Sequence, residues 1–243
     1  MIQKSFIFLK GISYNKEKSL YKQGIRSWNS FLETQKIKGI SKEKKIILDK
    51  ELIEAKHNLY TENTSYFSGV LPQKENYRLY PLFQDETLFL DIEIDSKRNI
   101  ILIGLFNGFK TKFMIKGFNL YKDILKKELE NYKLIVTFNG SSFDLPLIEK
   151  QLDLPITLPH IDLKHLCNKV GLKGSLKEIE LILNLKRPKH LLGHPVDAWK
   201  AAHASQDDRY LKALLNYNEE DLVNLRPILE YCYKQLEKEF TLE

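Results

Sequence analysis

The segment 87–140 constrains the fold of this chain more than any other part of its sequence. Three short apolar stretches joined by tight turns are typical of an antiparallel meander, and they lie at 87–94, 99–108 and 111–117. An amphipathic helix is predicted at 119–132, and a strand buried on both faces follows at 133–140. This order, continued by helices, predicts an α/β layered domain whose sheet begins with antiparallel pairing.

Helical patterns occupy most of the remaining chain. Apolar residues recur at helical spacing in 18–35, and a second helix is predicted at 41–60 with Ser41 as its N-cap. Four helices are predicted after the last strand, at 143–153, 160–171, 175–186 and from about Asp207 to Phe240, with 186–206 irregular and a bend near Pro227. Ser175 is the expected N-cap of the third of these helices, with Glu178 at the capping-box position. We therefore expect a mainly helical accessory segment at 1–86 and an α/β domain at 87–243.

Composition limits the class of protein. The chain has 243 residues, of which 43% are hydrophobic and 29% charged, so a packed core is expected. The two cysteines, Cys167 and Cys232, fit neither a zinc pattern nor a disulfide framework. The first apolar run is too short for a secretory signal and no stretch is long enough to span a membrane. A cytoplasmic protein is expected.

The net charge of +6 is unevenly distributed. Residues 1–86 hold 15 Lys and Arg against 10 Asp and Glu, and the eight aromatic side chains from Tyr14 to Tyr77 are interleaved with them. Lysines and aromatic rings together suit a phosphate backbone and stacked bases. A solvated lysine-rich surface would give the same composition, so the pattern indicates nucleic acid without excluding that alternative.

Two acids stand on the first strand of the meander. Successive strand residues alternate between faces, so Asp91 and Glu93 share one face while the opposite face is wholly apolar. Two buried carboxylates at this spacing repel each other, and a bound divalent cation removes that cost. The alternative is an edge strand with a solvated acidic face.

Two further acids occupy positions that are typical of functional residues. Asp144 follows the end of the buried strand at Asn139-Gly140, although capping of the next helix would also explain it. Asp221 lies on the apolar stripe of the last helix, and Tyr217 precedes it by one turn. A carboxylate on an inward stripe requires a partner there.

Taken in order, these residues resemble a known superfamily. An Asp-x-Glu on a first strand, an Asn-x3-Phe-Asp after a later strand and a Tyr-x3-Asp on the last helix resemble the DEDD exonucleases of the tyrosine-bearing subclass, which have the ribonuclease H-like fold. The stretches "LDIEIDS", "LIVTFNGSSFDLPLI", "GLKGSLKEIE" and "LLNYNEEDLVNL" resemble its YprB-like branch. The resemblance implies a mixed five-stranded sheet flanked by helices.

The resemblance also implies a chemistry. Asp91, Glu93, Asp144 and Asp221 would hold two divalent ions, Mg²⁺ or Mn²⁺, with Asp91 bridging them, and Tyr217 would orient the attacking water. The implied activity is 3′–5′ exonucleolytic hydrolysis of single-stranded nucleic acid, with DNA slightly favoured over RNA. Two alternatives stay open: a catalytically weak or inactive module that binds nucleic acid or a protein, and a structure-specific endonuclease on the same fold.

Substrate contacts are expected around the acids. The resemblance places Ile94, Asn139 and Phe143 beside the terminal nucleotide, and Arg78 is a candidate phosphate contact. The chain has Ile94-Asp95-Ser96 where many relatives have Thr-Thr-Gly, which puts substrate positioning in doubt and adds Asp95 as a candidate member of the acidic cluster. His160 and Asp162 are expected to support the site or cap a helix, and the accessory segment is a candidate surface for a homo-oligomer or an accessory protein.

Overall fold

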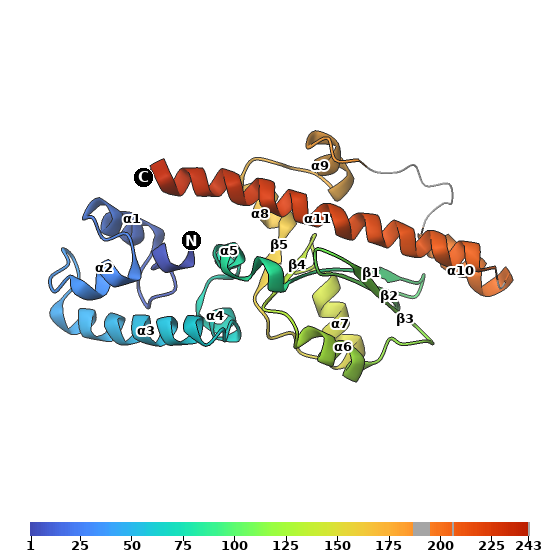
Figure 1. The fold of residues 1–243 in the computed structure, drawn as a ribbon, viewed down its shortest axis with the longest axis horizontal. Coiled ribbons are helices and arrows are strands. Elements are labelled where there is room, and N and C mark those ends of the chain that lie inside the picture. Colours follow the sequence, from blue (N-terminus) through green and yellow to red (C-terminus); the bar gives the residue numbers. More distant parts are fainter. Residues whose placement is uncertain (187–194, 206, 243) are drawn as a thin grey trace.

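A mixed five-stranded sheet forms the centre of the protein (Figure 1). The computed structural model describes residues 1–186, 195–205 and 207–242. The strands are β1 (Thr87–Ile94), β2 (Ile100–Phe106), β3 (Thr111–Ile115), β4 (Leu134–Thr137) and β5 (His160–Asp162). They are ordered β3-β2-β1-β4-β5; β1, β2 and β3 pair antiparallel, and β4 pairs parallel with both β1 and β5. The predicted meander is therefore confirmed.

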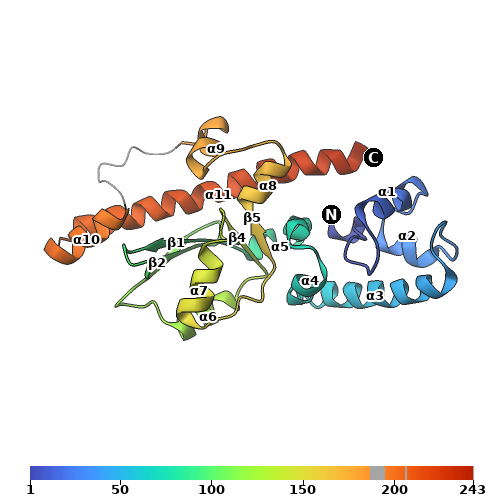
Figure 2. The ribbon, with the colours of Figure 1, turned by 180° about the vertical axis from the view of Figure 1, so that it is seen from behind.

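Helices cover both faces of the sheet, as Figures 1 and 2 show. Around the sheet the helices are α6 (Lys122–Leu129), α7 (Asp144–Leu152), α8 (Leu163–Lys169), α9 (Leu176–Ile182), α10 (Pro195–Ser205) and α11 (Asp208–Leu242). Leu88, Leu90 and Ile92 of β1 pack with α6 and α7, whereas Phe89 faces the core under α11. The alternation of β1 thus separates its two faces as predicted, and the acid-bearing face is the one that α11 covers.

The fifth strand comes from a segment that we predicted to be helical. Residues 160–171 show helical spacing, but their first three residues pair with β4, His160 with Ile135 and Asp162 with Thr137, and only then does α8 begin. A three-residue strand is too short to produce a recognisable period in the sequence. Its pairing with β4 completes the mixed five-stranded sheet.

The N-terminal segment is mainly helical, as predicted. Its elements are α1 (Tyr14–Lys22), α2 (Trp28–Glu33), α3 (Lys42–Tyr60), α4 (Ser65–Val70), a 3-10 helix at Gln73–Leu79 and α5 (Tyr80–Phe83). Ser41 caps α3 as expected, but 18–35 forms two helices rather than one. Gly24 has φ +82°, which ends the first helix, and Ser27 opens the second with a capping box.

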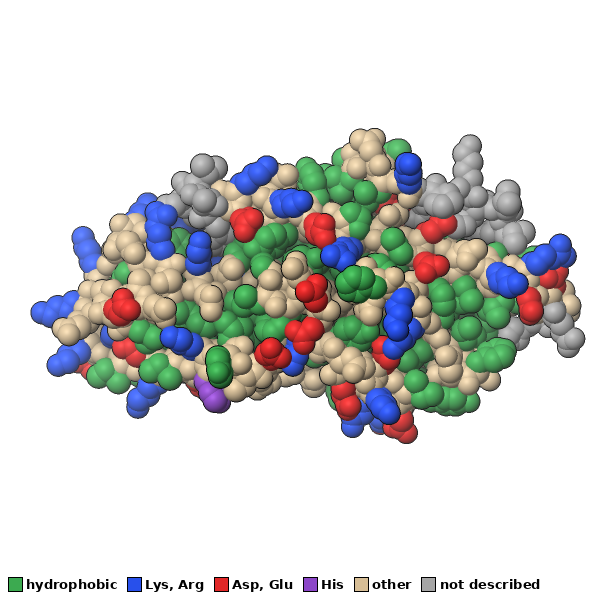
Figure 3. Space-filling view, in the orientation of Figure 1, with side chains coloured by type: hydrophobic (Ala, Val, Ile, Leu, Met, Phe, Trp, Pro, Cys, Tyr) green, Lys and Arg blue, Asp and Glu red, His purple; other side chains and the backbone are tan. Residues whose placement is uncertain are grey.

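The N-terminal segment and the sheet share apolar packing. Phe6, Phe31 and Leu48 belong to the same buried cluster as Phe89 and Leu225. The division at residue 86/87 therefore coincides with a change of secondary structure and not with a gap in the core. On the face shown in Figure 3, Lys and Arg side chains predominate at the N-terminal end.

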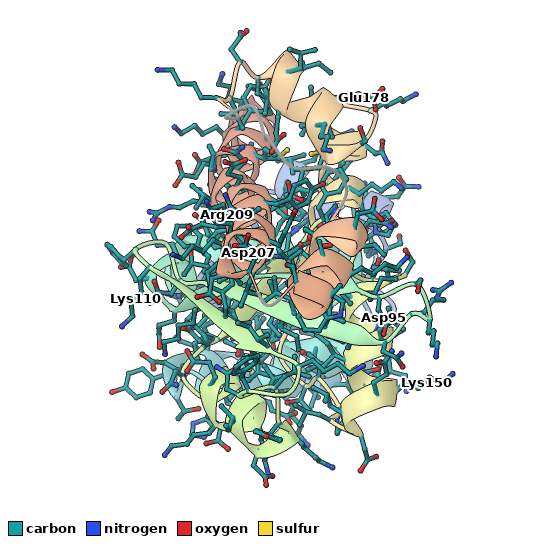
Figure 4. All side chains as sticks on the ribbon, turned by 90° about the vertical axis from the view of Figure 1, so that its right-hand side faces the viewer. Asp95, Lys110, Lys150, Glu178, Asp207 and Arg209 are labelled. Carbon is teal, nitrogen blue, oxygen red and sulfur yellow. The ribbon has the colours of Figure 1, made fainter. Side chains whose placement is uncertain are left out.

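The last helix confirms the prediction of one long element. α11 continues through Pro227 to Leu242. The segment 186–206, predicted to be irregular, contains α10, while 187–194 lie outside the described residues. Ser175 and Glu178 form the predicted capping box at the start of α9, where Figure 4 labels Glu178. Within the part of the chain that the structure describes, no helix is both long and apolar enough to cross a membrane.

Candidate functional site

Three carboxylates converge between β1 and α11. Asp91 and Glu93 project from the same face of β1, and Asp221 reaches them from α11, so that one ligand atom from each lies within 4.8 Å of the others. All three are partly buried. The strand and the helix thus bring together acids that lie far apart in the sequence.

Asp144 lies near this group and comes from α7. It is the first residue of α7 and is only 3% exposed. Its Oδ1 accepts a hydrogen bond of 3.1 Å from the backbone N–H of Ile92, the residue between Asp91 and Glu93. β1 pairs with β4 only as far as Phe89. Beyond that point, the Asp144 carboxylate takes the place of β4 as the acceptor for a backbone N–H group of β1. Asp144 therefore lies beside the segment of β1 that carries Asp91 and Glu93.

The electrostatics of the cluster favour protonation or a cation. Burial and then the charge of Asp221 raise the pKa of Glu93 to about 8, even though a hydrogen bond from Asn218 acts in the opposite direction. Burial raises the pKa of Asp144 to about 7, against the hydrogen bond from Ile92. Near neutral pH, Glu93 and Asp144 therefore retain protons to a large extent in the metal-free protein, and a bound cation would take the place of those protons.

Asn218 fixes the position of Asp91. Its Nδ2 donates a 2.7 Å hydrogen bond to Asp91 Oδ2, and the side chain is fully buried. Gly104 of β2, which pairs with Asp91, leaves the space that Asn218 occupies, because a Cβ at Gly104 would lie 1.8 Å from Asn218 Oδ1. A glycine inside a strand often marks such a close approach.

Comparison with known families decides the classification. The model of the RNase H superfamily matches residues 88–233, which include the five strands of the sheet except for Thr87 of β1, and all four acids. The chain belongs to the RNase H superfamily. No curated protein matches it in sequence.

Solved structures that resemble this RNase H superfamily chain include a DNA polymerase, NrnC and an exoribonuclease. The family B DNA polymerase of Pyrobaculum calidifontis is 15% identical over 60% of this chain and 24% of its own, with a TM-score of 0.46. NrnC of Brucella melitensis is 15% identical over 66% of this chain and 78% of its own, with a TM-score of 0.47. RNase D of Escherichia coli, an exoribonuclease, is 19% identical over 67% of this chain and 43% of its own, with a TM-score of 0.39.

The donor set of this RNase H superfamily member fits a divalent cation. Carboxylate oxygens are the ligands that Mg²⁺ and Mn²⁺ prefer, and Asp91, Glu93 and Asp221 present them within one ligand sphere. The raised pKa of Glu93 has the burial and the neighbouring acid as its causes, and a cation would offset both. Asp144 is held against the same strand by its hydrogen bond from Ile92, and its role as a ligand remains a prediction.

The helix face that carries Asp221 differs slightly from the predicted one. The fully buried stripe of α11 runs through Leu214, Asn218 and Leu222, whereas Tyr217 and Asp221 lie partly buried at its margin. The Tyr217 ring lies 5.2 Å from Nζ of Lys177, which α9 supplies. Sequence reasoning missed Asn218 and Lys177, and Gly104 was the only signal for the first of them.

The loop that leads to Asp144 is anchored by Asp162. Its carboxylate accepts hydrogen bonds from the backbone N–H of Asn139 at 2.9 Å and of Ser141 at 3.1 Å, and it also caps α8. Burial acts to raise the pKa of Asp162, but these hydrogen bonds hold it below its ordinary value. His160 is buried with a pKa lowered by burial to about 4, and its Nε2 lies 2.9 Å from Thr137 Oγ1. Asp162 thus caps a helix as expected, and support of the site by His160 remains a prediction.

The three predicted substrate contacts Asn139, Phe143 and Ile94 lie in different parts of the fold. Asn139 lies at the loop with φ +67°, and Phe143 lies partly buried with the Arg98 guanidinium 5.9 Å from its ring. Ile94 packs on the α6 and α7 side of the sheet, beyond a register shift between Glu93 and Ile94. These three residues border the acids or the loop behind them, and their contact with substrate remains a prediction.

Asp95 and Arg78 are engaged elsewhere. Asp95 closes the β1–β2 turn by accepting hydrogen bonds from the backbone N–H groups of Lys97 and Asn99, and Figure 4 shows it at the periphery of the molecule. It does not join the acidic cluster. Arg78 is 2% exposed and is paired with Glu17 and Glu75. We therefore no longer consider Arg78 a phosphate contact.

Enlarging Gly104 is expected to damage both stability and the site. Gly104→Ala places a methyl group in the space of Asn218, and such overpacking typically costs about 1–3 kcal/mol. The displaced amide no longer holds Asp91, so binding of a divalent cation should also weaken. Gly69→Ala is the matched control, because nothing lies within 4 Å of a Cβ there. Equal melting temperatures of the two variants would contradict the close approach.

Cation binding is expected to stabilise the protein more strongly as the pH rises. Because the folded-state pKa values of Glu93 and Asp144 lie above their ordinary values, the metal-free protein loses stability as pH rises from about 4.5 to 8. A divalent ion replaces those protons, so Mn²⁺ at a hundredfold excess over Kd should raise Tm by about 5–10 °C at pH 8. With the same Mn²⁺ concentration, the rise in Tm should be smaller at pH 5, where protons compete with the ion.

Thermal melts with and without Mn²⁺ at both pH values measure this effect. Asp221→Asn should abolish the Mn²⁺-dependent rise, whereas Asp153→Asn, an exposed acid on the other side of the sheet, should retain it. A rise of equal size at the two pH values would show that the ion does not compete with the buried protons.

Proposed function

We propose that this chain is a metal-dependent 3′–5′ exonuclease that hydrolyses phosphodiester bonds in single-stranded nucleic acid, with DNA slightly favoured over RNA. The observation that carries the proposal is the convergence of Asp91, Glu93 and Asp221 within 4.8 Å, with Asp144 of α7 held against β1 through the backbone N–H of Ile92. The RNase H superfamily fold and the position of Tyr217, four residues before Asp221, support it. The tyrosine-bearing DEDD subclass and its YprB-like branch are part of the proposal.

The four acids would hold two divalent ions, Mg²⁺ or Mn²⁺. When bound, these ions supply positive charge to the phosphoryl group and lower the pKa of water. Asn218 keeps Asp91 oriented toward the site through its 2.7 Å hydrogen bond. Ile92 does the same for Asp144 through its backbone N–H. The chain thus presents its ligands in fixed orientations before any ion or substrate arrives.

The remaining residues act on the water and the substrate. Tyr217 would orient the attacking water by a hydrogen bond from its hydroxyl group. The water oxygen forms a bond to phosphorus, the bond from phosphorus to the 3′ oxygen of the preceding nucleotide breaks, and that oxygen takes up a proton. The products are a 5′-mononucleotide and a strand that is shorter at its 3′ end.

A time course on 5′-labelled single-stranded DNA and on RNA of the same sequence tests this proposal. With Mg²⁺ or Mn²⁺ we expect a ladder that shortens from the 3′ end and disappears with chelator. Fragments from a circular substrate would instead identify an endonuclease. A folded protein that cleaves neither substrate would be a binding module, and the Ile94-Asp95-Ser96 segment would then be examined first.

The proposal includes a setting for the protein. Cys167 and Cys232 lie buried with their sulfur atoms 3.7 Å apart and both thiols free, which suits the reducing cytoplasm that we propose as its location. The N-terminal segment remains the proposed surface for contacts with substrate, with a second copy or with an accessory protein.

A further inference from the structure

We propose that a groove between the N-terminal segment and α8 binds the single strand on the 5′ side of the nucleotide being removed. The inference rests on the proposed exonuclease function and extends its binding site. The groove has a volume of about 840 Å³, and the side chains that the argument uses are Tyr14, Lys74, Glu75, Asp162, His165 and Lys169. This volume is within the range of sites that enclose a small-molecule ligand.

The groove begins at the same edge of the sheet as the acids. Asp162 ends β5 and lines the groove, while Glu93 lies near the end of β1, and these two strands run parallel on either side of β4. Two strand spacings, roughly 10 Å, separate β1 from β5. In open α/β sheets ligands bind beyond the carboxyl ends of the strands. A strand whose 3′ end lies at the acids can therefore continue into the groove.

α8 gives the groove its direction. Asp162 and His165 lie at the first turn of this helix, next to the loop that leads to Asp144. At the other end of the helix, Lys169 donates hydrogen bonds to Glu75 at 2.9 Å and to the hydroxyl of Tyr77 at 3.1 Å. The groove thus extends from the active-site loop to the N-terminal segment.

Two exposed rings in the groove can stack on bases. Tyr14 is 38% exposed, and its hydroxyl donates a 2.9 Å hydrogen bond to Glu75, which fixes the ring. Lys74 Nζ lies 5.0 Å from the centre of the same ring. The His165 side chain is 62% exposed at the near end of the groove. Aromatic rings beside lysines are the usual means of holding unpaired bases together with their phosphates.

The charge that the groove presents to solvent is positive. Its two acids, Glu75 and Asp162, are 1% and 6% exposed. Hydrogen bonds from Arg78, Lys169 and Tyr14 occupy Glu75, and backbone N–H groups occupy Asp162. By contrast, Lys74 is exposed and the Lys169 side chain is 35% exposed. A phosphate backbone complements this distribution.

The rings select a single strand over a duplex. In a duplex the base faces are stacked on each other, so an exposed tyrosine finds no base on which to stack. Pro72, Ile161 and Leu166 add an apolar surface to the groove, which suits unpaired bases better than a sugar-phosphate backbone alone. We therefore infer that the groove holds unpaired nucleotides.

Binding of a fluorescent single-stranded oligonucleotide of about 16 nucleotides tests this inference, measured by anisotropy in EDTA so that no turnover occurs. The double variant Tyr14→Ala/Lys74→Ala is expected to raise Kd at least about fivefold, from the loss of one stacked base. The control Tyr60→Ala/Lys50→Ala removes an exposed tyrosine and an exposed lysine from α3, outside the groove, and should change Kd by no more than about twofold.

Further variants separate the ring from the fold. Tyr14→Phe keeps the ring and loses only the hydrogen bond to Glu75, so it should bind like the wild type. Lys74→Ala alone changes an exposed side chain and should reduce the slope of log K against log salt by about 1, as expected for one phosphate contact. Melting temperatures show whether Tyr14→Ala is folded.

The results distinguish failure of this inference from failure of the proposed function. Hydrolysis of a dinucleotide, which is too short to reach the groove, should be the same in the wild type and in Tyr14→Ala/Lys74→Ala. An unchanged Kd for the long oligonucleotide in that variant and in Lys74→Ala would show that the groove does not bind the strand, whether or not the protein hydrolyses the dinucleotide. Absence of dinucleotide hydrolysis by the wild type would count against the exonuclease, and the binding data would still report on the groove.

Discussion

Replacing Asp221 with asparagine is expected to lower the rate of phosphodiester hydrolysis about a thousandfold. Asp221 supplies one of the three ligand atoms that meet within 4.8 Å, and asparagine keeps its shape while removing its charge. A correctly held cation contributes several kcal/mol of transition-state stabilisation, and the loss of about 4 kcal/mol corresponds to a factor of about 10³. Asp144→Asn should have a similar effect because its carboxylate meets β1 at Ile92.

Single-turnover hydrolysis of labelled DNA measures this change. Glu219→Gln provides a control on the same helix, since Glu219 lies outside the acidic cluster. Calorimetric titration with Mn²⁺ should show weaker ion binding by Asp221→Asn than by the control. Hydrolysis by Asp221→Asn at a near-normal rate would remove Asp221 from the site and reject the assigned ligand set.

The second large effect is expected on stability, at Arg78. This side chain is 2% exposed, its Nε donates a 2.6 Å hydrogen bond to Glu75, and its Nη1 lies 3.3 Å from Glu17. Glu17 also accepts the backbone N–H of Phe6, so it cannot move to solvent without disturbing the first residues. Arg78→Ala leaves buried carboxylates without their cation, which typically costs about 3–5 kcal/mol.

For a chain of this length, that cost corresponds to a fall in Tm of roughly 10 °C. Arg209→Ala is the matched control, because Arg209 also pairs with an aspartate, Asp207, but its side chain is 85% exposed. Its Tm should equal that of the wild type, as expected for a screened surface pair. If Arg78→Ala melted with the wild type as well, the buried pairs of Arg78 with Glu17 and Glu75 would not stabilise the fold.

The sequence predicted those features that follow from local periodicity. β1 alternates between an apolar and an acidic face, and the long helix carries an acid beside its buried stripe, so Asp91, Glu93 and Asp221 could be found without coordinates. Ser41 and Ser175 could be identified as helix caps because capping depends on neighbouring residues alone. The positions of the strands and the order of the acids then indicated the fold.

Other features depend on contacts between distant segments and have no local signal. β5 contains three residues and is defined only by its pairing with β4. Asn218 looks like an ordinary polar residue until β1 and β2 are placed beside it, and Asp95 turns away from the acids because Asn99 and Lys97 bind it at the turn. The groove at Tyr14 arises from the packing of α8 against a segment far from it in sequence.

The separation of the site along the chain has a consequence during translation. Asn218 and Asp91, which bond directly, lie 127 positions apart. At about 5–20 residues per second, a ribosome needs roughly 6–25 s to pass from one to the other. Throughout that interval the nascent polypeptide carries its first two acids without α11 to complete their surroundings. The proposed nuclease is therefore expected to be inactive toward the messenger RNA that encodes it until α11 docks on the sheet.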